Sequence, residues 1–110
     1  MIRWSPAYSP AAAKRPSCPH RRLRRLLTGQ LPAGLSLGAS ILRPWASANF
    51  VGARHIFPAS GELADPGALQ ERLAATEWRL AGHIVADVAV EQSEGEGEGA
   101  LRIEILTVEE

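Results

Sequence analysis

Two histidines and one carboxylate are the side chains of this sequence best suited to chemistry: His55, His83 and Asp87. Two imidazoles and a carboxylate can hold a transition metal, and a histidine beside a carboxylate can work as an acid–base pair. His83 and Asp87 are four residues apart in one predicted strand, which places them on the same face but about 13 Å from each other. His55, on a neighbouring strand, would have to bridge that gap. A metal-dependent or acid–base enzyme is therefore an alternative, and the sequence itself assigns no metal ligand, catalytic residue or cofactor.

The short motifs of common enzyme classes are missing from the sequence. It contains no G-x-S-x-G nucleophile turn, no glycine-rich phosphate loop leading into a helix and no H-E-x-x-H pair. The single cysteine, Cys18, cannot form an intramolecular disulfide or build a structural zinc site. The glutamates of residues 93–99 alternate with glycine and lack calcium-loop spacing, so we expect a flexible hairpin loop there. These observations favour a protein that is not an enzyme.

A basic segment is the next candidate site, and it consists of Arg21, Arg22, Arg24 and Arg25. Residues 1–55 hold nine basic residues and no acid, for a net charge of +9, whereas residues 56–110 hold three arginines and twelve acids, for −9. Arginine clusters neutralise phosphates, so nucleic-acid binding through these four side chains is a further alternative. The segment has no nearby aromatic side chain on which a base could stack, and the acidic half can supply the counter-charge. Nucleic acid is therefore the less favoured partner.

Residues 1–44 are expected to form a basic arm that is largely disordered. Prolines at positions 6, 10, 16, 19, 32 and 44 interrupt helices and cannot donate to a central strand. Within residues 20–28, three leucines share one helical face, which predicts one or two turns of helix.

The same arm has features of a targeting signal. Twin arginines, a weakly apolar stretch over residues 31–42 and Ala46-Ser47-Ala48 are typical of export signals, and the lack of acids before Glu62 is typical of transit peptides. We expect a cytoplasmic protein whose arm is an extension before the folded part, with export or organelle targeting as the alternative. No apolar run reaches the roughly 18 residues that a transmembrane helix needs.

Residues 45–110 predict a small α+β domain with the order β-α-β-β. The expected elements are a strand over 46–57, a helix over 66–77 that starts at Asp65-Pro66, and strands over 80–92 and 100–108. The last strand should lie between the other two, which gives a three-stranded antiparallel sheet with one covering helix.

Three segments of this domain are similar to short uncharacterised bacterial proteins: Trp45-Ala-Ser, Phe50-x-Gly-Ala-Arg-His55 and Gly82-His-Ile-Val-Ala-Asp87. The resemblance covers residues 45–110 and implies no known activity. Eleven arginines to one lysine, with eighteen alanines, is a bias of high-GC coding sequences and also favours a bacterial origin.

One helix can cover one face of such a sheet, which leaves the other face exposed. In the predicted register that face carries four apolar residues among charged ones: Val85, Ala89, Leu106 and Val108. A mixed apolar patch suits an isologous contact, and edge pairing through residues 46–57 is a second route. We therefore predict a non-catalytic binding or self-association module that forms a homodimer or binds a small protein partner.

Overall fold

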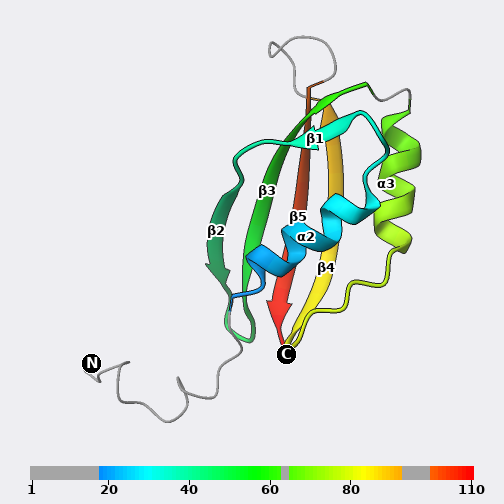
Figure 1. The fold of residues 1–110 in the computed structure, drawn as a ribbon. Coiled ribbons are helices and arrows are strands. Elements are labelled where there is room, and N and C mark those ends of the chain that lie inside the picture. Colours follow the sequence, from blue (N-terminus) through cyan, green and yellow to red (C-terminus); the bar gives the residue numbers. More distant parts are fainter. Residues whose placement is uncertain (1–17, 63–64, 93–99) are drawn as a thin grey trace.

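The computed structural model describes residues 18–62, 65–92 and 100–110. These residues form an α+β fold of two layers, in which helices α2 and α3 pack on one face of a five-stranded antiparallel sheet (Figure 1). The elements follow the chain as α2 His20–Gln30, β1 Leu35–Leu37, β2 Ile41–Ala46, β3 Val51–Gly61, α3 Pro66–Ala75, β4 His83–Gln92 and β5 Leu101–Glu109. The strand order is β1-β3-β5-β4, with β2 also paired to β3. The prediction that the last strand lies between the other two is confirmed for β3, β5 and β4.

The predicted order β-α-β-β is present from residue 51 onward as β3-α3-β4-β5, but the three-stranded sheet is not, because the chain before residue 51 adds one helix and two strands. α2 is eleven residues long rather than one or two turns, and β2 continues across the expected domain start at residue 45. Pro44 is tolerated within β2 because this strand pairs with β3 alone, so few backbone N–H donors are needed on the side of β2 that faces away from β3. Of the predicted disordered arm, residues 1–17 lie outside the described residues, as does the predicted loop over 93–99.

The core lies between the sheet and the two helices. β3 turns His55, Phe57 and Ala59 toward the helices, and all three are buried. α2 is too short to be stable alone in water, so its stability comes from burying Leu23 and Leu27 completely against this face. The remaining core members come from β1, α3, β4, β5 and the connection between α3 and β4, namely Leu35, Leu69, Leu73, Leu80, Val88, Leu101, Ile103 and Ile105.

A β-bulge at Ala86 divides β4 into two segments with opposite facing. Val85 pairs with Thr107 and Asp87 with Leu106, so one extra residue separates these two pairs. His83 and Val85 therefore face the helices, whereas Asp87 faces the opposite side of the sheet. The expectation that His83 and Asp87 share a face is wrong for this reason, and so is the placement of Val85 on the exposed face.

The outer edge of β4 is closed by Gln70 of α3. Its side-chain amide nitrogen donates to Val88 O at 2.6 Å, and its oxygen accepts from Val90 N at 2.6 Å. The side chain therefore occupies the position that a neighbouring strand would take.

We expect Gln70→Ala to lower the free energy of unfolding by about 2 kcal/mol, because two half-buried backbone groups lose their partners. The variant should also aggregate more readily through the exposed edge. Chemical denaturation measures the first effect and turbidity on heating the second. Glu71→Ala, one residue further along the same helix and exposed, is the matched control and should change neither. Equal behaviour of the two variants would contradict this role.

Candidate functional site

His55 lies at the centre of a polar network beneath α2. It is fully buried in β3, and the N-terminal residue of α2, His20, lies against it with the two Nδ1 atoms 2.8 Å apart. The rings are within 13° of parallel. Rings stacked face to face cannot bring two nitrogens that close, because their surfaces stay about 3.5 Å apart. The two imidazoles therefore meet edge to edge and share one N–H···N hydrogen bond.

A hydroxyl group lies at each end of the histidine pair. Ser40 Oγ, in the connection between β1 and β2, is 2.7 Å from His20 Nε2, and Thr107 Oγ1 of β5 is 2.8 Å from His55 Nε2. Thr107 Oγ1 also lies 3.4 Å from the carbonyl oxygen of Ala53. A continuous line of polar contacts thus runs from Ser40 through His20 and His55 to Thr107 and Ala53.

One assignment of protons satisfies every contact along this line. Since a carbonyl can only accept, Thr107 donates to Ala53 O and must accept from His55 Nε2–H. The other nitrogen of neutral His55 then accepts from His20 Nδ1–H, which leaves His20 Nε2 as the acceptor of the Ser40 hydroxyl proton. The network therefore holds a serine hydroxyl against the basic nitrogen of a neutral histidine.

Burial keeps both histidines neutral. Desolvation, followed by the charges of His20 and His83, lowers the pKa of His55 from 6.5 to about 4. Desolvation also lowers the pKa of His20, and the Arg24 guanidinium one turn further along α2 adds to this effect. At pH 7 His55 is therefore neutral and can accept the proton of His20 Nδ1–H.

The structure does not bring the three predicted chemical residues together. His83 is buried on the helix side, where its Nδ1 donates to Ala81 O at 3.1 Å, while Asp87 lies on the other side of the sheet. Among the described residues no three histidine, cysteine or carboxylate side chains are arranged to hold a metal ion. The partners that His55 does have are His20 and Thr107, and neither these two residues nor Ser40 was a candidate from the sequence.

The four arginines of the predicted nucleic-acid site lie on α2, and two of them donate hydrogen bonds to other described residues. Arg24 donates to the carbonyl oxygens of Gly38 at 2.8 Å and Leu37 at 3.4 Å, and Arg22 donates to Arg79 O at 3.1 Å. Arg21 and Arg25 are exposed. Arg22 and Arg24 thus anchor α2 to the rest of the fold.

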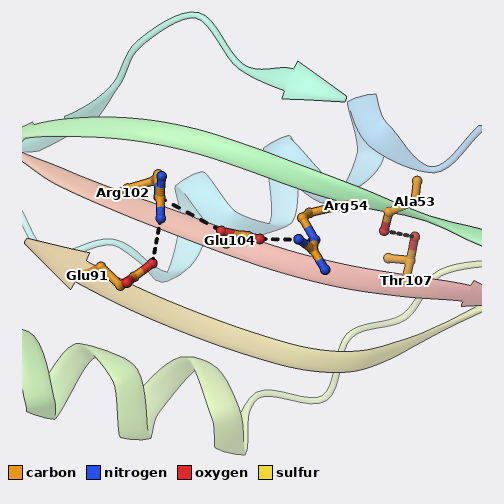
Figure 2. A network of polar contacts seen from close by, with 6 residues as sticks. All are labelled: Ala53, Arg54, Glu91, Arg102, Glu104 and Thr107. Atoms are coloured by element: carbon orange, nitrogen blue, oxygen red, sulfur yellow. Dashed lines mark hydrogen bonds and ion pairs between the residues drawn. The ribbon is translucent and has the colours of Figure 1, made fainter. Parts of the chain in front are cut away.

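The sheet face opposite the helices, called the open face below, is a second candidate site. It carries three of the four predicted interface residues, Ala89, Leu106 and Val108, whereas Val85 packs against the core. A line of alternating charges crosses it, which Figure 2 shows: Arg54 contacts Glu104 at 3.1 Å, and Arg102 contacts Glu91 at 2.8 Å and Glu104 at 3.9 Å. Exposed pairs of this kind add little stability, so their arrangement matters more for what can bind the face.

Comparison with protein-family models, with curated proteins and with solved structures finds no significant match to this chain. Within the described part of the chain, neither helix has the length and apolar composition to cross a membrane.

Proposed function

We propose that this protein is a self-association module in which two copies pack through their open faces. The observation that carries the proposal is the one-sided sheet: both helices pack on the same side and contribute to one core. Ile84, on the open face, is 53% exposed and Ile41 is 46% exposed. These two residues lie on opposite edge strands, and Ile56, Leu106 and Val108 lie on the strands between them, so apolar side chains are spread across the face and favour a contact surface.

The edges of the sheet are less suited to association than its open face. Gln70 closes the middle of β4, and Pro44 removes a donor from the middle of β2. The predicted edge route through residues 46–57 is wrong, because β3 lies inside the sheet with β5 on one side and β1 and β2 on the other.

Two rows of side chains cross the open face, and each row is complementary to the same row of a second copy in the reverse order. One row runs Arg43, Arg54, Leu106, Asp87 from β2 to β4, with its positive charges at one end and its negative charge at the other. The next row runs Trp45, Gly52, Val108, Ile84 and carries no charge. Within the described part of the chain, neither Arg43 nor Asp87 forms an ion pair.

In a dimer whose twofold axis runs parallel to the strands, each row lies over the same row of the other copy in the reverse order. The rotation places β2 of one copy over β4 of the other, so Arg43 faces the Asp87 of the second copy and Trp45 faces its Ile84. The opposite charges meet at the rim of the contact, and the apolar row meets an equal apolar row. Charge pairs at the rim set the orientation, while the apolar contacts supply most of the affinity.

The charge arrangement gives a direct test in solution. We expect Asp87→Arg to weaken the dimer at least about tenfold, because two arginines then face each other at both ends of the contact. Combining Arg43→Asp with Asp87→Arg should restore association, since the pair is exchanged rather than lost. Sedimentation velocity over a concentration series measures the dissociation constant of each variant.

The exchange also provides its own control for folding, because both substitutions are on the exposed surface. Glu71→Arg, an equal change of charge on α3, should leave the dissociation constant unchanged. A double variant as weak as Asp87→Arg, or a wild-type protein that stays monomeric at hundreds of micromolar, would contradict the proposed contact.

A further inference from the structure

We propose that Ser40, His20 and His55 form a catalytic relay that hydrolyses small carboxylic esters through an acyl group carried on Ser40. In this relay Ser40 is the nucleophile, His20 is the general base and acid, and His55 is a positioning residue. The three lie on the helix side of the sheet, so the activity is independent of association through the open face.

The geometry has the elements that an activated serine requires. The Ser40 Oγ–His20 Nε2 distance of 2.7 Å is within the range for direct proton transfer, and the base is held by a third group through its other nitrogen. His55 in turn is fixed by Thr107 at 2.8 Å and by complete burial. The proton assignment that satisfies the whole network leaves the lone pair of His20 facing the serine hydroxyl.

Acylation of Ser40 needs no reactant other than the ester. Ser40 Oγ bonds to the carbonyl carbon of the ester while its proton passes to His20 Nε2, and the carbonyl electron pair moves to oxygen. When the pair returns, the bond to the alcohol oxygen breaks, and the leaving alkoxide takes the proton from His20. Water then repeats the sequence on the acyl-serine, and Ser40 recovers its proton, so the products are a carboxylic acid and an alcohol.

His55 supports this sequence by staying neutral. Its lone pair on Nδ1 accepts from His20 Nδ1–H, and this bond strengthens when His20 becomes an imidazolium. The low pKa of His55, about 4, keeps that lone pair free at neutral pH. Since a neutral imidazole stabilises the imidazolium less than a carboxylate does, we expect a slow enzyme.

The substrate class is inferred from the size of the nearest cavity. A cavity of about 260 Å³ is lined by Cys18 and Pro19, the two residues before His20, by Leu42, two residues after Ser40, and by Thr107, the partner of His55; the three relay residues themselves do not line it. Pro44 and Ala53 add apolar surface to its wall. This volume is small for a ligand site and suits a short acyl chain such as acetyl or butyryl.

The first test uses the intact wild-type protein and a fluorophosphonate probe, which reacts with activated serines. Mass spectrometry of the labelled peptides compares Ser40 with Ser36 and Ser60, two exposed serines of β1 and β3 that serve as internal controls. We expect Ser40 to react at least about 100-fold faster, the smaller contribution typical of a general base. Labelling of Ser40 no faster than that of the two controls would overturn the proposal.

The second test separates the positioning role of His55 from a structural role. We expect His20→Gln to reduce Ser40 labelling to the level of Ser36, and His55→Leu to reduce it at least about tenfold. His55→Gln should retain most of the labelling, because its side-chain oxygen can still accept from His20 Nδ1–H. If leucine and glutamine at position 55 give equal labelling in variants that unfold cooperatively, His55 has no role in the reaction.

The third test measures turnover of p-nitrophenyl acetate and butyrate at pH 7. It is run in a Cys18→Ala background, because the exposed thiol at the cavity could react with these esters by itself. Ser40→Ala should abolish the protein-dependent rate, while Ser60→Ala should not change it. A rate that survives Ser40→Ala would place the activity elsewhere and overturn the assignment.

Discussion

Acidification from pH 7 to pH 4 should lower the free energy of unfolding by about 3 kcal/mol through His55 alone. The pKa of this residue falls from 6.5 to about 4 on folding, mainly because burial removes the imidazole from water. Between these two pH values the unfolded chain binds more protons than the native protein. The stabilisation is therefore complete above pH 6.5 and is lost as the pH falls toward 4.

The groups around His55 define the control for this experiment. His20 of α2 and His83 of β4 face it, and their charges at low pH oppose its protonation, while Thr107 of β5 is neutral. Chemical denaturation of the wild type and of His55→Gln, at fixed protein concentration, gives two curves of stability against pH. The difference between the curves should change by about 3 kcal/mol between pH 7 and pH 4. Parallel curves would show that His55 keeps an ordinary pKa in the native state.

Gly52→Ala should be strongly destabilising, with a loss of about 3 kcal/mol in the free energy of unfolding. A Cβ atom at this position would overlap the backbone carbonyl oxygen of Thr107 and lie 3.0 Å from the indole Nε1 of Trp45. The carbonyl belongs to the neighbouring strand and cannot move aside as a flexible side chain would. The end of the β3–β5 ladder would have to separate to admit the methyl group.

Gly29→Ala is the matched control for this substitution. Gly29 lies in α2, and a Cβ atom there would meet no atom within 4 Å. Alanine favours the helix by up to about 1 kcal/mol over glycine, so this variant should be more stable than the wild type. Thermal and chemical denaturation of the two variants give the comparison. Opposite signs are expected, and a neutral Gly52→Ala would contradict the close approach of the strands.

The half of the fold with clear periodicity could be predicted from the sequence. The segments 80–92 and 100–108 alternate strongly, and Asp65-Pro66 marks a helix start, which the structure confirms through the contact from Ala68 N to Asp65 Oδ1 at 3.2 Å. Residues 20–46 were harder because two prolines and five arginines interrupt their apolar pattern, and their structure depends on burial against β3. The leucine stripe of α2 was the signal that this segment packs on the sheet.

The candidate site could be predicted only in part. His55 stands out in the sequence for its chemistry, but its partner His20 lies in the predicted basic arm, and Ser40 lies in the weakly apolar stretch over residues 31–42. The contact between His20 and His55 forms because α2 folds back onto β3, and these two residues are 35 positions apart in the chain. The bulge at Ala86 separates His83 from Asp87, and the small and β-branched residues around it give no sequence signal that predicts it.

The most direct test of the proposed self-association is an intermolecular nuclear Overhauser experiment on a mixture of differently isotope-labelled copies. Within one copy Trp45 and Ile84 are at opposite ends of a row, three strand spacings or about 14 Å apart, too far for such a signal. In the open-face dimer the Ile84 methyl groups of one copy contact the Trp45 indole of the other. We expect cross-peaks between these two side chains in the mixed sample. A monomer without them, or a dimer whose intermolecular cross-peaks come from the helices, would contradict the account.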